Sequence, residues 1–210
     1  MHVGYASFFQ NLRGLPDHEV WRSELARADA AERLGFGSIW CTEHHFDHYT
    51  MSPNVLQFLT WVAARTERIR LGSAVVVLPW HDPVRVAEDI SVLDHMSGGR
   101  VVLGIGRGLG RIEFDGFRLE MGESRQRFVE HAEAIMQAFD EGHIDYDGKL
   151  YRQPRIDIRP APLAPLRGRT YASAVSPESM EIMARLGVGL MIIPQKPWPT
   201  VVDEIRDYRE

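Results

Sequence analysis

The 210-residue sequence has almost no cysteine and no long apolar run, and these absences exclude an internal disulfide and a membrane-spanning helix. Its single cysteine, Cys41, cannot form a disulfide within the chain, which favours a reducing compartment such as the cytoplasm. No apolar stretch approaches the ~20 residues of a membrane-spanning helix, and the N-terminus lacks the charged and apolar regions of a signal peptide. We therefore expect a cytoplasmic protein that does not contact a membrane.

An excess of basic residues is also missing, because 24 lysines and arginines stand against 29 aspartates and glutamates, for a net charge of −5. Proteins that bind nucleic acid usually carry a basic surface, so we expect no nucleic-acid partner. What the chain does contain is ample apolar material, 44% of its residues, with 25% charged. These proportions exclude a disordered chain and are typical of a globular protein. The length fits a single domain over residues 1–210.

Short apolar segments alternate along the chain with longer segments of helical period. The strand-like segments cover residues 3–8, 38–42, 69–78, 101–105, 169–174 and 188–193. The helical segments cover residues 17–34, 54–66, 83–96, 125–139, 177–186 and 200–209. Residues 143–167 interrupt this alternation, and Asp147-Gly148 within them predicts the turn of a small hairpin. The pattern predicts an α/β fold with a parallel sheet, either doubly wound or closed into a barrel.

In both architectures ligands bind at the carboxyl ends of the strands, so the residues that follow each strand are candidates for a site. The second strand is followed by EHHFDH at residues 43–48. Imidazole titrates near neutral pH and suits acid–base catalysis, although a partly exposed polar loop is the simpler alternative. A metal site made by Cys41, His44 and His48 is a weaker alternative, because the zinc-binding sequences HExxH and HxxEH are absent. We expect no metal.

The fourth strand is followed by GIGRGLG at residues 104–110. Glycines allow backbone amides to approach an anion, and Arg107 adds positive charge. The dinucleotide-binding sequence GxGxxG is not matched, because residue 109 is leucine and we expect no helix over residues 111–122. A flexible turn without a ligand is the alternative interpretation.

The fifth strand is followed by SPES at residues 176–179, which is typical of a helix start, where free backbone amides favour anions. Ser176 and Ser179 can add hydroxyl donors, and simple helix capping is the alternative. Arg125 stands at the start of another predicted helix. Together with Arg107 and the glycine loop, these residues can converge on one phosphate group, with an imidazole facing the other end of the ligand. The residues thus predict a phosphorylated cofactor beside an acid–base group, but they do not identify the cofactor.

Several segments resemble the bacterial luciferase-like monooxygenase family. The matching segments are EHHF at residues 43–46, IRLGSAVVVLPWHDPVRVAEDISVLDHMSGGRVVLGIGRG at 69–108, ESRQRF at 123–128 and SPESMEIMARLG at 176–187. They occur in order over nearly the whole chain. The resemblance implies a TIM-like (β/α) barrel that binds reduced FMN or, in some branches, a reduced deazaflavin.

The resemblance also implies roles for single residues. Four match positions that hold the flavin phosphate: Arg107, Arg125, Ser176 and Ser179. Ala74 and Val75 match a strand end at which the family has a non-proline cis peptide beneath the flavin ring. His44 matches the catalytic histidine beside the reactive edge of the flavin.

The resemblance further implies an FMN-dependent monooxygenase that oxygenates a small organic substrate, such as an aldehyde, with O₂ and with reduced FMN from a separate flavin reductase. A deazaflavin-dependent oxidoreductase and a truncated, non-catalytic flavin-binding protein are the alternatives. Family barrels have eight strands, whereas six are counted here, so we expect an incomplete barrel whose C-terminal part is missing. Its unpaired edges favour a homodimer or other oligomer, and its open site favours poor coupling of flavin oxidation to oxygenation.

Overall fold

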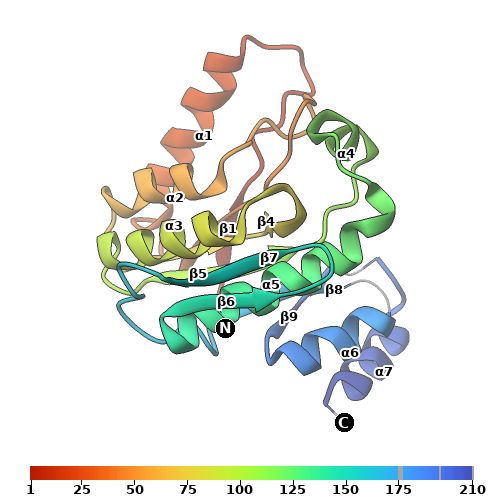
Figure 1. Ribbon diagram of the computed structural model, residues 1–210. Helices are drawn as coiled ribbons and strands as arrows, with labels where there is room; N and C mark the ends of the chain where they lie inside the picture. The colour runs from red at the N-terminus through yellow and green to blue at the C-terminus, as the bar shows by residue number, and fades with distance from the viewer. Residues whose placement is uncertain (175–176, 194, 210) are drawn as a thin grey trace.

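The computed structural model describes residues 1–174, 177–193 and 195–209 and contains a curved parallel sheet with helices on its outer face (Figure 1). Six strands pair in chain order: β1 (Gly4–Ser7), β2 (Ser38–Cys41), β3 (Arg70–Ser73), β5 (Val101–Gly106), β8 (Thr170–Ala174) and β9 (Gly189–Ile192). The short strand β4 (Val76–Val77) follows β3 and also pairs with β5. The six strands predicted from the sequence are confirmed.

The outer face of the sheet is covered by amphipathic helices. These are α1 (Asp17–Ala31), α2 (Val55–Ala63), α3 (Pro83–Met96), α5 (Ser124–Glu141) and α6 (Pro177–Leu186), with α7 (Trp198–Arg209) packed beside α6. Alternate strand residues such as Ile39, Leu71 and Leu103 point toward these helices and are completely buried. The helix α3 begins after its N-cap, Asp82, whose carboxylate accepts the backbone amide of Val84 at 2.9 Å.

A strand order that follows the chain, with helices on the outer face, is the construction of a TIM-like barrel rather than of a doubly wound sheet. Within the described residues the sheet does not close, because β1 and β9 form its two edges. The predicted incomplete α/β barrel is therefore confirmed. No helix in the described ranges is both long enough and apolar enough to cross a membrane.

The hairpin predicted within residues 143–167 is also present. It consists of β6 (His143–Asp147) and β7 (Arg152–Asp157), which pair antiparallel and lie outside the barrel over α3 and α5 (Figure 1). Ile144 of β6 is fully buried among small apolar residues of these two helices. Glu130 of α5 accepts the three successive backbone amides of residues 149–151 in the turn, at 2.7–3.0 Å. A buried carboxylate thus holds the turn of the hairpin against α5, beside the apolar packing of Ile144.

The prediction that residues 111–122 form no helix is wrong. The chain forms α4 (Arg111–Phe117) and then the 3₁₀ turn η2 (Met121–Glu123). A helix as short as α4 has little intrinsic stability, so it depends on tertiary packing that a local sequence pattern does not reveal. Phe114 is completely buried, and the ring of Phe117 stacks on Trp80 with their centroids 5.6 Å apart. These aromatic contacts hold the segment in helical form.

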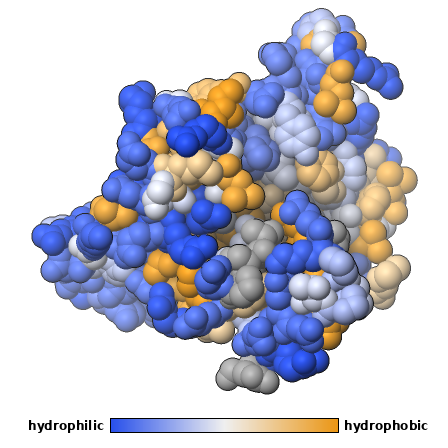
Figure 2. Space-filling view, turned by 90° about the vertical axis from the view of Figure 1, so that its right-hand side faces the viewer, coloured by the Kyte–Doolittle hydropathy of each residue, from blue (hydrophilic) through white to orange (hydrophobic). Residues whose placement is uncertain are grey.

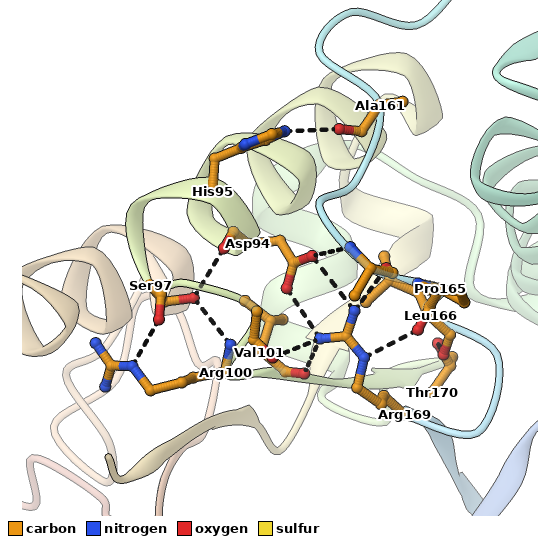
Figure 3. Close-up of polar contacts among 12 residues, drawn as sticks. Asp94, His95, Ser97, Arg100, Val101, Ala161, Pro165, Leu166, Arg169 and Thr170 are labelled. Carbon is orange, nitrogen blue, oxygen red and sulfur yellow. Dashed lines mark hydrogen bonds and ion pairs between the residues drawn. The ribbon is translucent and has the colours of Figure 1, made fainter. Parts of the chain in front are cut away.

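A buried ion pair joins the last turn of α3 to the loop before β8, at the amino ends of the strands (Figure 3). Asp94 of α3 is fully buried and accepts hydrogen bonds from Arg169 Nη1 at 2.9 Å and from the backbone amide of Ala164 at 3.1 Å. Arg169 also donates to the backbone carbonyls of Gly99 and Val101. Because this end of a barrel lies opposite the usual ligand site, we assign the ion pair to stability.

Candidate functional site

Those residues singled out by the sequence that the structure describes lie in the loops at the carboxyl ends of β2, β3 and β5 and at the starts of α5 and α6. Figure 2 views the molecule from this side, where separate apolar patches interrupt a mainly hydrophilic surface. Parallel neighbouring strands bring their carboxyl ends to one rim. Residues far apart in the sequence can therefore act together there.

Arg107 and Arg125 line one small cleft together with Ser179 of α6. The cleft has a volume of about 50 Å³, several times the ~10–15 Å³ that one water molecule needs. Arg107 donates to Ser124 Oγ at 3.3 Å, and Arg125 Nη2 lies 3.7 Å from Glu178 Oε2. Burial and the positive charge of Arg125 lower the pKa of Arg107. Two neighbouring guanidinium groups that repel each other indicate a place for an anion.

Three of the four predicted phosphate-binding residues are thus brought together, namely Arg107, Arg125 and Ser179. Ser176, the fourth, lies outside the described residues. Two guanidinium groups and a hydroxyl are a donor set that suits the oxygens of a phosphate group. The residues therefore fit the phosphate of a flavin cofactor, and their role as its ligands stays a prediction.

The peptide bond between Ala74 and Val75 is cis, which is the geometry that the resemblance implies at this position. It joins β3 to β4, and Ala74 donates its amide to the carbonyl of Cys41 at 2.7 Å. A Cβ atom at Gly106 would lie 2.3 Å from Val75 Cγ2 and 3.2 Å from Ser173 Oγ. Only glycine leaves room for these neighbours at the end of β5. The contact of Ala74 and Val75 with a flavin ring stays a prediction.

His44 is half-buried and is held by a carboxylate that the sequence analysis did not identify. Its side chain is 40% exposed, and its Nδ1 lies 3.0 Å from Oε1 of Glu113, a residue of α4 that is only 2% exposed. The same oxygen accepts the backbone amide of His45 at 3.0 Å. Glu113 lies in the first turn of α4, a helix that the sequence pattern does not predict, so no local signal could have identified it.

A second buried carboxylate, Glu43, binds the other two histidines of the site. Its Oε1 lies 3.0 Å from His45 Nε2 and 2.6 Å from His81 Nε2, and its Oε2 accepts the Val77 amide at 2.8 Å. Burial acts to raise the pKa of Glu43, but the hydrogen bonds from His45 and His81, the charge of His81 and the Val77 amide outweigh it and lower this pKa. Because Val77 belongs to β4, Glu43 fixes the strand that follows the cis peptide.

The same contact shifts the pKa of His81 in the opposite direction, upward. Burial acts to lower the pKa of His81, but the hydrogen bond and the negative charge of Glu43, with a smaller effect of Asp89, outweigh it and raise this pKa. No sequence motif indicates a role for His81. Glu43 and His81 therefore form an ion pair beside β4 whenever His81 is protonated, and the raised pKa of His81 favours that state.

The metal alternative gains no support from the geometry. Burial raises the pKa of Cys41 to about 12, so a thiolate ligand is disfavoured there. Across residues 1–174, 177–193 and 195–209, no group of three or more His, Cys, Asp or Glu side chains is arranged to hold a metal ion.

Known proteins resemble this chain over most or all of its length. The family model described as luciferase-like monooxygenase matches residues 1–210. The alkanal monooxygenase alpha chain of the Kryptophanaron alfredi symbiont is 30% identical over 178 residues, which is 85% of this chain and 50% of that protein. The oxygenase component of the flavin-dependent trigonelline monooxygenase of Acinetobacter baylyi is 28% identical over 194 residues, 90% of this chain and 54% of that protein.

A solved structure shows the same fold. The crystal structure of the monooxygenase RslO1 from Streptomyces bottropensis matches with a TM-score of 0.92 and 30% sequence identity, over 100% of this chain and 65% of that one. The chain spans about half the length of the curated relatives it matches.

Proposed function

Because the chain belongs to the luciferase-like monooxygenase family, we propose that it binds reduced FMN and takes part in the oxygenation of a small organic substrate, such as an aldehyde, by O₂. The observation that carries this proposal is the convergence of Arg107, Arg125 and Ser179 on one cleft. The cleft lies at the same strand ends as the cis peptide and as His44.

In this proposal the phosphate of FMN binds between Arg107 and Arg125, with Ser179 and Ser176 as hydroxyl donors. Hydrogen bonds from guanidinium groups to phosphate oxygens are charge-assisted and therefore strong. When bound, the reduced flavin supplies the electrons with which O₂ is activated. His44 then accepts or returns a proton through Nε2, because its Nδ1 is occupied by Glu113.

A separate flavin reductase is part of the proposal. It is supported by the relative from Acinetobacter baylyi, which is named as an oxygenase component. A homodimer or other oligomer is a further part, since the two edge strands of the sheet carry unpaired backbone groups.

The proposal is tested by fluorescence titration of the protein with FMN, riboflavin and a deazaflavin cofactor. A charge-assisted hydrogen bond contributes about 1.5–3 kcal/mol, so Arg107→Ala should weaken FMN binding ~10- to 150-fold. Riboflavin, which lacks the phosphate, should bind both proteins alike. The matched control is Arg111→Ala, whose side chain is 75% exposed on α4 and whose loss should leave FMN affinity unchanged.

Two results would contradict this assignment. If Arg107→Ala weakened FMN and riboflavin equally, the arginine would not bind the phosphate. If the deazaflavin cofactor bound more tightly than FMN, a deazaflavin-dependent oxidoreductase would replace the proposed monooxygenase.

A further inference from the structure

We infer that Glu113 is the positioning residue of His44 and holds its imidazole as the Nδ1–H tautomer, so that Nε2 is the basic nitrogen presented to the site. The inference rests on the proposed function for the use that is made of His44. The arrangement itself rests on contacts between described residues, which join the histidine loop after β2 to α4.

The hydrogen bonds to Glu113 Oε1 determine which nitrogen carries the proton. The backbone amide of His45 can only donate, so Oε1 acts as an acceptor at 3.0 Å. An ionised carboxylate oxygen can only accept, so His44 Nδ1, which lies 3.0 Å from the same oxygen, is the donor. A neutral imidazole has one N–H, which leaves a lone pair on Nε2 of His44.

The burial of Glu113 stabilises its hydrogen bond with His44. Glu113 is 2% exposed, so water does not compete for its hydrogen bonds, whereas the His44 side chain is 40% exposed. A Cβ atom at Gly110 would lie 2.1 Å from Glu113 Oε2, so the last glycine of GIGRGLG provides the space that the carboxylate occupies. Gly110 has an ordinary φ of −75°, which means that space rather than backbone conformation requires glycine.

A carboxylate behind a histidine contributes in two ways. It fixes the orientation and tautomer of the ring, and it stabilises the imidazolium that forms when Nε2 takes up a proton. The N–H bond made at Nε2 is broken again when the proton is returned, so His44 leaves the cycle unchanged. His44 lines a cleft of its own, separate from that of Arg107 and Arg125. The titratable groups that line this cleft or face the His44 ring are Asp17 of α1, Glu113 of α4, and His45, Asp47, His48 and Tyr49 of its own loop.

The tautomer can be measured without flavin or substrate, by NMR of the 210-residue protein with ¹⁵N-labelled histidine. At about pH 8.5, where an ordinary imidazole is neutral, we expect His44 to appear as the Nδ1–H form. Its signal is assigned by its disappearance in His44→Gln. In Glu113→Leu, which removes the acceptor at nearly constant shape, we expect the Nε2–H form that histidine prefers in water. The matched control Asp115→Asn, which removes an exposed carboxylate from the same helix, should leave the signal unchanged.

Glu113→Gln keeps an acceptor oxygen but removes the charge, and it provides the functional half of the test. We expect His44 to stay in the Nδ1–H form and FMN affinity to change by less than about 3-fold. The oxygenation rate of an intact homologous oxygenase with the same substitution should fall about 10- to 100-fold. Glu113→Asp should restore part of the rate.

An Nε2–H form of His44 in the unsubstituted protein would overturn the inference, even if Glu113→Leu failed to fold. So would an unchanged Nδ1–H form in a folded Glu113→Leu protein. If the tautomer shifts as expected while the oxygenation rate of every variant stays unchanged, the positioning by Glu113 holds and the proposed role of His44 fails.

Discussion

At the scale of single residues, two buried carboxylates organise the three histidines of the site. Glu113 binds the His44 ring and the His45 backbone amide, while Glu43 binds the rings of His45 and His81. His45 is therefore held at both its backbone and its ring, and its side chain is only 11% exposed. Of these two histidines, His44 has the more exposed ring, 40% against 11% for His45, which supports it as the acid–base group.

The role of His44 predicts a loss of turnover rather than of binding. A positioned acid–base group contributes a factor of about 10²–10⁴ to the rate. His44→Ala should therefore lower the oxygenation rate by that factor when it is made in an intact homologous oxygenase. FMN affinity should stay within about 3-fold, because the phosphate ligands are elsewhere. Single-turnover oxidation of reduced FMN with product analysis measures both quantities, and His48→Ala, an exposed histidine of the same loop, is the control. Full oxygenation by His44→Ala would show that this residue is structural.

The ion pair of Glu43 with His81 predicts how stability depends on pH. The raised pKa of His81 stabilises the fold fully below its ordinary value of 6.5, and this contribution is lost as pH rises through the higher value of the folded state. The lowered pKa of Glu43 contributes above its ordinary value of 4.5 and is lost as pH falls through the lower folded value. The pair should therefore stabilise the fold most between about pH 4.5 and 6.5.

Urea unfolding of the unsubstituted protein and of His81→Gln from pH 5 to pH 9 tests this expectation. The free energy of unfolding should decline above pH 6.5 more steeply in the unsubstituted protein than in the variant. Parallel pH profiles of the two proteins would show that the pair does not contribute.

At the scale of elements, a segment is predictable when its own sequence carries the pattern. The strands, the helix capped by Asp82 and the β6–β7 hairpin all follow from periodicity, capping and turn residues. The helix α4 does not, because packing of Phe114 and Phe117 holds it in place. The same division applies to the site: Arg107 and His44 follow strands and could be identified. Glu113 acts on a histidine 69 positions away, a contact that only the folded chain creates.

The attachment of the hairpin by Glu130 is a prediction at this scale. Glu130→Ala leaves three backbone amides of the turn without their acceptor, which should destabilise the hairpin by about 1–3 kcal/mol. Hydrogen–deuterium exchange should then speed up over residues 143–157 while the strands β1 to β5 stay protected. Asp145→Ala, an exposed position of β6, is the matched control. Unchanged exchange in the hairpin of Glu130→Ala would contradict the assignment.

At the scale of the whole molecule, ligand binding and stability occupy opposite ends of the sheet. The arginines proposed to bind phosphate lie beyond the carboxyl ends of the strands, whereas the Asp94–Arg169 pair joins α3 to the loop before β8 at the amino ends. This separation means that stability can be altered without direct damage to the proposed flavin site.

The buried Asp94–Arg169 ion pair should contribute more to the free energy of unfolding than an exposed ion pair of the same helix does. Asp94→Ala leaves the guanidinium of Arg169 without its carboxylate, and breaking a buried pair costs about 3–5 kcal/mol. Asp89→Ala on the same helix removes an exposed carboxylate that lies 3.9 Å from Arg85, and it should cost less than about 1 kcal/mol. Urea unfolding measures both, and equal losses in the two variants would contradict the special role of Asp94.

The strand order has a consequence for the way the chain is made. Each of the five main strands after β1 pairs with the main strand that precedes it in the sequence, so an emerging strand meets an edge that has already been synthesised. Chains fold from the N-terminus during translation, and contacts between near neighbours in sequence form faster than distant ones. The sheet can therefore grow on the ribosome one strand at a time from β1. Arg107 follows the fourth of these strands and Ser179 the fifth, so the proposed phosphate cleft would be assembled late, on a scaffold that is already folded.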